Sequence, residues 1–196
     1  MSVNTGRRVL LVRHGSVATC YDGVCYGRSD VELSDDGWQQ SRALAQELAA
    51  LPITHLFHSG LVRARSLAEL IATERGIAAT LDPRLAEFNF GQWELRRWQA
   101  IFEEVGDALA EVVKAPETFR PPSGETAHEL RDRVLGWYRE LPAKGLIVAV
   151  AHGGPIAALR GTLAGASASQ WPALIPLHGQ WVELDETATG AAAALP

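Results

Sequence analysis

Two histidines of this 196-residue chain follow apolar runs, and each is itself followed by glycine. Arg13-His14-Gly15 comes directly after residues 9–12, and His152-Gly153-Gly154 comes directly after residues 146–151. Continuous apolar runs are typical of strands that are buried on both faces of a parallel sheet. Ligands bind at the carboxyl ends of such strands. We therefore expect both imidazoles at one edge of a sheet, where glycine lets a substrate approach the backbone closely.

Arginines accompany these histidines. Arg13 at the end of an apolar strand would be costly to bury without a partner, which is either a phosphate or a protein carboxylate. Arg63 and Arg65 follow Ser59-Gly60-Leu61, just past another short apolar run. Residues i and i+2 of a helix diverge, so we expect one arginine to point inward and the other to solvent.

A carboxylate is the fourth candidate group. Glu87 lies within Leu85–Glu94, among apolar neighbours. That setting suits a carboxyl group that acts as a proton donor. On the residues alone, an ordinary loop carboxylate is the alternative.

Strands alternate with helices along the chain, which predicts an α/β fold with a largely parallel sheet. We expect strands at residues 9–12, 53–57, 77–81, 146–151 and 181–184. We expect helices after Ser34, after Ser59, around residues 98–105, around 130–141 and from Pro155 onward, with apolar residues at helical spacing. The length favours a single domain over residues 1–196, with a core at about 8–184 and a frayed tail at 185–196.

Composition excludes several classes of protein. Lys and Arg total 18 and Asp and Glu total 23, which gives a formal charge of −5 and no general basic face for nucleic acid. No apolar run approaches the roughly 18 residues that a membrane span needs. Cys20 and Cys25 are too few for a disulfide framework, and no zinc-type cluster is visible. We expect a cytoplasmic protein that binds neither membrane nor metal; its oligomeric state stays open, a dimer included.

Four motifs together resemble the histidine phosphatase superfamily, which includes the phosphoglycerate mutases. The resemblance runs from about Val9 to Leu184 and implies a three-layer, phosphoglycerate mutase-like sandwich with a mostly parallel central sheet flanked by helices. The motifs, in chain order, are Arg13-His14-Gly15, Ser59-x-Leu61-x-Arg63-Ala64, Glu87-x-x-x-Gly91-x-Trp93-Glu94 and His152-Gly153.

Within that superfamily the chain is similar to the α-ribazole phosphatases of cobalamin biosynthesis. The similar stretches are Cys25–Leu33, Phe90–Glu94 and Pro121–Thr126. Two departures concern the pocket rim: Ser16-Val17 replaces the Glu-Thr that many members have after the first motif, and Cys20 replaces an asparagine.

The resemblance implies a role for each matched residue. His14 is the nucleophile and forms a phosphohistidine, and Glu87 protonates the leaving oxygen and then helps to activate water. Arg13, Arg63 and His152 hold the phosphoryl oxygens, and no metal or other cofactor is needed. The glycines at positions 15 and 153 belong to the substrate site. For Arg28, contact with the substrate and a plain surface position are both open.

The leading functional hypothesis is a phosphomonoesterase that acts on α-ribazole 5′-phosphate or another small phosphate. A sugar phosphatase of broad specificity and a phosphoglycerate mutase-like enzyme are the alternatives. We expect a 196-residue chain to lack room for the insertion with which the mutases close their site. A non-catalytic phospholigand-binding module and a protein phosphohistidine phosphatase are further alternatives, and the stretch from Trp93 to Gly124 looks able to cap a pocket.

Overall fold

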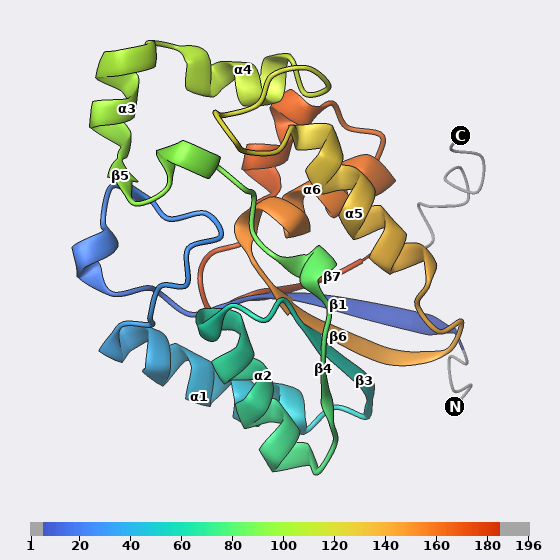
Figure 1. Cartoon of the computed structure of the whole chain (residues 1–196). Coiled ribbons are helices and arrows are strands. Elements are labelled where there is room, and N and C mark those ends of the chain that lie inside the picture. The colour runs from blue at the N-terminus through green and yellow to red at the C-terminus, as the bar shows by residue number, and fades with distance from the viewer. Residues whose placement is uncertain (1–5, 185–196) are drawn as a thin grey trace.

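The computed structural model describes residues 6–184, so the expected frayed tail at 185–196 lies outside the described residues. A five-stranded sheet forms the centre of the molecule, in the order β4-β3-β6-β1-β7 (Figure 1). Four strands are parallel: β1 (Arg7–Arg13), β3 (Ile53–His58), β4 (Ala79–Leu81) and β6 (Gly145–Ala151). The fifth, β7 (Trp181–Glu183), is antiparallel to β1. All five predicted strands are confirmed, and the mostly parallel sheet with them.

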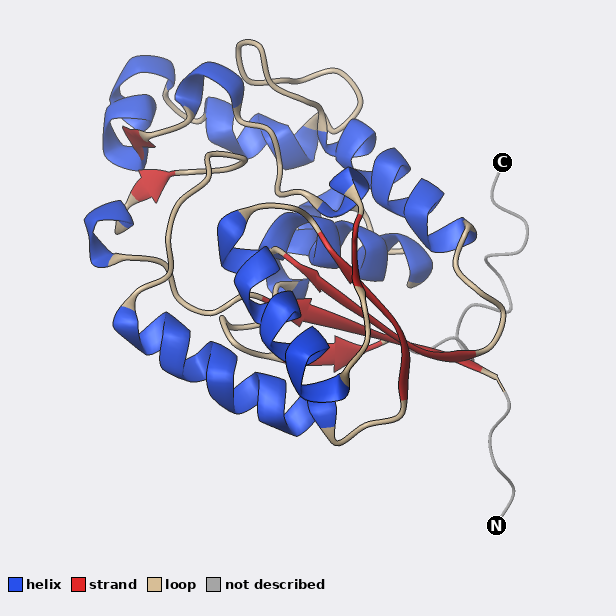
Figure 2. Cartoon of the chain, turned by 60° about the horizontal axis from the view of Figure 1, so that its bottom comes forward, coloured by secondary structure: helices blue, strands red, loops and turns tan. Residues whose placement is uncertain are grey.

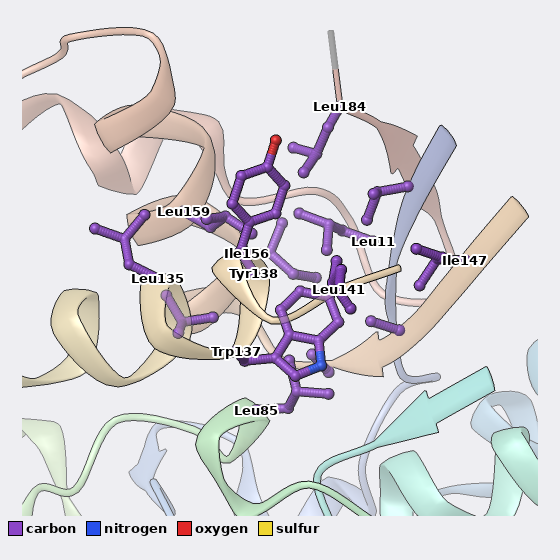
Figure 3. Packing of buried hydrophobic residues seen from close by; sticks show 14 residues of the cluster. Leu11, Leu85, Leu135, Trp137, Tyr138, Leu141, Ile147, Ile156, Leu159 and Leu184 are labelled. Atoms are coloured by element: carbon purple, nitrogen blue, oxygen red, sulfur yellow. The ribbon is translucent and has the colours of Figure 1, made fainter. Parts of the chain in front are cut away.

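Helices cover both faces of this sheet, as Figure 2 shows. Alternate residues of β1 point to opposite faces. Leu10 and Val12 pack with α1 (Asp35–Ala49) and α2 (Val62–Arg75). Val9 and Leu11 pack with α5 (Ala127–Arg139) and α6 (Gly153–Leu163). Figure 3 shows the cluster that contains Val9 and Leu11, in which the Trp137 side chain lies between α5 and the strands. The predicted three-layer sandwich is therefore confirmed.

Local signals explain where the helices begin. The Ser34 hydroxyl accepts a hydrogen bond from the Gly37 amide at 3.0 Å and caps α1. Thr126 and Glu129 form a reciprocal capping box at the start of α5. Leu51 continues the apolar spacing of Leu44 and Leu48, but it comes after that helix has ended at Ala49.

Residues 91–124, which we call the cap segment, leave the sandwich and return to the same place. The Gln92 amide donates to the Pro122 carbonyl at 2.8 Å, and a Cβ on Gly91 would lie 2.2 Å from that carbonyl oxygen. Between these ends lie a short strand, β5 (Arg96–Arg97), paired with β2 (Val24–Cys25), and two helices, α3 (Trp98–Val105) and α4 (Ala108–Lys114). The sequence predicted α3 but neither α4 nor the two-stranded ribbon.

The cap segment rests on the sandwich through its own apolar cluster. Ile101 and Val112 from the cap segment pack with Trp171 and with residues of α5 and α6. Phe102 of α3 is apolar, but 58% of it is exposed, because only one side of this eight-residue helix meets the cluster. Four short 3-10 helices complete the described chain: Thr19–Tyr21, Pro83–Leu85, Gly91–Trp93 and Ala168–Leu174. No helix within residues 6–184 has the length and apolarity to cross a membrane.

Candidate active site

The candidate residues meet at one edge of the sheet, where the parallel strands end. His14 follows β1, Ser59 follows β3 and His152 follows β6. The chain leaving β4 reaches Glu87 within six residues. Because β7 is antiparallel, its first residue lies at this same edge, and His178 stands just before it.

His14 is a buried, neutral imidazole. It is 1% exposed, and its Nδ1 lies 2.6 Å from the Gly15 carbonyl oxygen, to which it donates a proton. Its Nε2 lies 3.3 Å from the Nε of Arg63. Burial, and then the Arg63 guanidinium, lower the pKa of His14 well below its ordinary value. The lone pair of the neutral imidazole therefore lies on Nε2, where it accepts a hydrogen bond from Arg63 Nε.

His152 lies beside His14, with ring centroids 5.0 Å apart. Its Nε2 lies 2.7 Å from the Ser59 hydroxyl, which itself accepts from the Leu61 amide at 3.4 Å. We assign the hydroxyl as the donor to Nε2, which puts the proton of the neutral imidazole on Nδ1. That Nδ1 is buried and has no partner within residues 6–184. Burial and the Arg63 charge lower the pKa of His152. It is thus a neutral donor suited to an acceptor oxygen.

The arginines bear out the expected divergence on α2: Arg63 is fully buried, whereas Arg65 is exposed. Arg63 donates to the carbonyls of Gly27 and Ser29 at 2.6 and 2.8 Å. The Tyr26 ring lies 5.1 Å from its guanidinium carbon. These contacts fix the guanidinium against the nucleophile.

Arg13 reaches the same region from β1. Its Nη1 donates to the Pro176 carbonyl at 2.8 Å, and its buried Nε has no partner among the described residues. A free, buried guanidinium N–H is a ready donor to an anion.

Glu87 is aimed at the start of α6. One carboxylate oxygen accepts from the Phe88 amide at 2.8 Å and from the Gly154 amide at 3.0 Å. A Cβ on Gly154 would lie 2.3 Å from that oxygen, so glycine is what allows the approach. Burial lowers the pKa of the Arg63 guanidinium, and the nearby Glu87 carboxylate opposes that shift.

A buried network holds the backbone of Glu87. Its carbonyl accepts from Arg28 Nε at 3.1 Å and from Arg133 Nη2 at 2.9 Å. Both arginines also donate to the Glu125 carboxylate, which in addition accepts from the Asn89 amide at 2.8 Å. The structure therefore places Arg28 on the Glu87 loop, a position that the sequence had left open. Sequence reasoning missed Arg133, which lies outside the motifs, and the role of Glu125, which lies within one.

A cavity of about 220 Å³ opens beside these groups. Arg13, Glu87 and the two glycines that begin α6 form its polar end. The remaining lining residues are apolar: Phe88, Phe90, Val112, Val113, Ala127, Leu130, Ala157, Trp171, Pro172 and Ile175. Two of them, Val112 and Val113, belong to the cap segment. The expectation that Trp93 to Gly124 can cap a pocket is confirmed through Val112 and Val113.

A family profile of the histidine phosphatase superfamily (branch 1) matches residues 9–195. The chain belongs to this superfamily. A protein from Escherichia fergusonii called "Probable phosphoglycerate mutase GpmB" is 35% identical over 161 residues, which are 81% of this chain and 75% of that protein.

Solved structures of phosphatases resemble this histidine phosphatase over most of its length. A mycobacterial glucosyl-3-phosphoglycerate phosphatase in complex with VO3 is 29% identical, with a TM-score of 0.79 over 91% of this chain and 92% of that one. The α-ribazole phosphatase from Shigella flexneri is 26% identical, with a TM-score of 0.77 over 91% and 90%. The chain is accordingly a phosphatase-type enzyme, and the predicted family is confirmed.

The motif glycines of this histidine phosphatase have more than one task. A Cβ on Gly15 would lie 2.3 Å from the Gly37 carbonyl oxygen, so Gly15 lets the first motif pack against the start of α1. Gly153 lines the cavity, and a Cβ there would lie 3.0 Å from Ile175.

The two departures from the family pattern also have defined places. Ser16 donates from its amide to Gln40 at 2.9 Å, while Cys20 is exposed and Cys25 is buried, both as free thiols. Within residues 6–184, no three His, Cys, Asp or Glu side chains are grouped as a metal site.

Sequence reasoning also missed a third histidine of the site. His178 lies in none of the sequence motifs, yet its ring centroid lies 5.2 Å from that of His14. Its Nε2 is buried and has no partner among the described residues. Burial, and then the charges of Arg13 and Arg63, lower its pKa to about 4. No local signal marks it, because His178 reaches this edge only through the antiparallel direction of the last strand.

Proposed function

We propose that this histidine phosphatase is a metal-independent phosphomonoesterase that works through a phosphohistidine on His14, with α-ribazole 5′-phosphate as its substrate. The observation that carries the mechanism is the tautomer of His14. Because Nδ1 donates to the Gly15 carbonyl, the lone pair lies on Nε2, where it accepts from Arg63 Nε, among donors that suit a phosphoryl group.

In the first step, His14 Nε2 attacks phosphorus and the bond to the leaving oxygen breaks. Glu87 gives its proton to that oxygen, so the alcohol leaves neutral. Arg13, Arg63 and the Nδ1–H of His152 hold the non-bridging oxygens as charge develops on them. In the second step, a water attacks phosphorus while the Glu87 carboxylate takes its proton. The P–N bond breaks, which restores His14 and releases phosphate.

The apolar cavity supports the choice of substrate. It adjoins Glu87, the group that meets the leaving oxygen, so it is where the rest of the leaving group would lie. Aromatic walls such as Phe88, Phe90 and Trp171 suit a flat, apolar ring like the benzimidazole base of α-ribazole. A bare sugar or a glycerate would leave its hydroxyls or carboxylate facing apolar carbon, which costs free energy.

The test is phosphate release in excess EDTA from a set of phosphomonoesters. The set contains α-ribazole 5′-phosphate, 3-phosphoglycerate, glucosyl-3-phosphoglycerate, fructose 2,6-bisphosphate, ribose 5-phosphate and 4-nitrophenyl phosphate. We expect kcat/KM to be highest for α-ribazole 5′-phosphate. A phosphoenzyme that is labile to acid and stable to base should form on mixing.

His14→Ala is the active-site variant, and His55→Ala is its control, because His55 is exposed on β3. We expect His14→Ala to abolish both turnover and the phosphoenzyme, and His55→Ala to change neither. Equal, weak rates on every ester would refute the α-ribazole assignment and favour a phosphatase of broad specificity. Transfer of phosphate between the hydroxyls of phosphoglycerate, without release, would establish a mutase.

A further inference from the structure

His178 is a half-buried titratable residue that the mechanism above does not use. Its imidazole lies against the ring of the nucleophile, 5.2 Å between centroids, and His152 lies on the same ring at 5.0 Å. The nucleophile is thus flanked by two imidazoles. One of them, His152, belongs to the family motif, and the other does not.

The segment that carries His178 is bound to the catalytic motif itself. The Gly179 amide donates to the His14 carbonyl at 2.9 Å. The Arg13 amide donates to the Gln180 carbonyl at 2.9 Å, and the Arg13 side chain donates to the Pro176 carbonyl at 2.8 Å. Both sides of His178 are therefore held by the two residues that begin the site, and its ring has a fixed place relative to His14.

A nitrogen of this fixed ring lacks a partner. Nε2 of His178 is buried and has no partner in the part of the chain that the structure describes, and the same holds for Nδ1 of His152 and Nε of Arg13. Buried polar atoms are ordinarily hydrogen-bonded, and leaving one unpaired is costly. Three such atoms belong to residues that adjoin His14, beside the guanidinium groups of Arg13 and Arg63. A bound anion with several acceptor oxygens would pair all three.

We propose that His178 is a further phosphoryl-binding residue, whose Nε2–H donates to an oxygen of the anion that Arg13 and His152 also hold. This inference rests on the proposed phosphoryl site. Because the ring is neutral, it adds a donor without adding a third fixed positive charge beside Arg13 and Arg63. The negative charges of a bound phosphate dianion offset the positive charges of Arg13 and Arg63, which lie near the imidazole.

Three variants separate hydrogen bonding from packing. His178→Phe keeps an aromatic ring against His14 and removes the nitrogen, whereas His178→Asn and His178→Gln keep a donor on a smaller or more flexible side chain. His55→Phe is the matched control on the surface. Binding is measured as the Ki of metavanadate and of inorganic phosphate against turnover of 4-nitrophenyl phosphate. Thermal unfolding checks that each variant is folded.

We expect both Ki values to rise by about 10- to 100-fold in His178→Phe, as is usual for the loss of a hydrogen bond to a charged group. At least one of the two amide variants should recover most of this loss. His55→Phe should match the wild type. In ¹⁵N NMR of the wild-type protein, the His178 Nε2 resonance should shift on addition of phosphate.

Wild-type Ki values in folded His178→Phe would overturn the proposal and leave His178 as a packing residue. It would also be overturned if neither amide variant bound better than His178→Phe. Failure of the wild-type protein to bind vanadate or phosphate would instead refute the phosphoryl site itself, so the two failures are distinguishable.

Discussion

A single methyl group on Gly154 should uncouple the proton donor from the rest of the site. Gly154 lies in the first turn of α6, where its amide donates to Glu87. An alanine Cβ at this position would lie 2.3 Å from the Glu87 carboxylate oxygen and 3.5 Å from Leu130. An ordinary contact needs roughly 1 Å more, so the carboxylate must move away.

The expected loss follows from this displacement. A catalytic group misplaced by about 1 Å costs on the order of 100-fold in rate, which corresponds to about 2.7 kcal/mol. General acid catalysis as a whole contributes about 10²- to 10⁴-fold. We therefore expect Gly154→Ala to lower kcat/KM by about 100-fold for an alkyl phosphate, whose leaving oxygen needs a proton. For 4-nitrophenyl phosphate, whose leaving group needs little protonation, we expect less than about a threefold change.

The assay compares kcat/KM for these two esters in the same protein samples. Gly136→Ala is the control: Gly136 also lies within a helix, and a Cβ there would have its nearest neighbour, an Arg84 nitrogen, at 3.9 Å. Alanine should raise helix propensity at both positions, so only the contact with Glu87 differs. An equal loss on both esters, or no loss on the alkyl phosphate, would refute the placement of Glu87 as the proton donor.

Three further outcomes follow from the contacts of the site. Ser59→Ala removes the hydroxyl that we assign as the donor to His152 Nε2. We expect kcat/KM to fall by about 3- to 10-fold on all esters. An unchanged kcat/KM would contradict the role of Ser59. Glu125→Gln should lower the free energy of unfolding by about 2 kcal/mol, measured by urea denaturation, because the partly buried guanidinium groups of Arg28 and Arg133 lose a charged hydrogen-bond acceptor. It should also slow alkyl esters more than aryl esters, through the loop of Glu87. The pKa values of His14 and His152 are lowered in the folded state, so below about pH 6.5 the unfolded chain binds protons that the folded chain does not. Urea denaturation at several pH values should show stability falling with acidification below that pH, by up to about 1.4 kcal/mol per pH unit for each histidine, and a flat profile between pH 6.5 and 5 would contradict these directions.

The sequence predicted the site residues that follow the parallel strands, because the pattern that indicates them is local in the chain. An apolar strand followed by Arg13-His14-Gly15 carries both the position and the chemistry within seven residues. The divergence of Arg63 and Arg65 likewise follows from helix geometry alone.

What the sequence could not predict depends on strand direction and on contacts across the fold. His178 belongs to the site only because β7 is antiparallel to β1, and its short apolar run does not show its direction. The role of Arg133 in holding Glu87 joins α5 to a loop 46 residues earlier in the chain. Such pairings depend on how the layers pack.

The cap segment has a consequence for how this enzyme can change. Residues 91–124 depart and return at one point, where the amide of Gln92 meets the carbonyl of Pro122. His14, Arg13 and Arg63 lie outside this segment, while Val112 and Val113 within it line the cavity. The segment can therefore be exchanged as a unit. An insert of different length, joined at the same two ends, would change which phosphate esters bind and would leave the residues that hold the phosphoryl group in place.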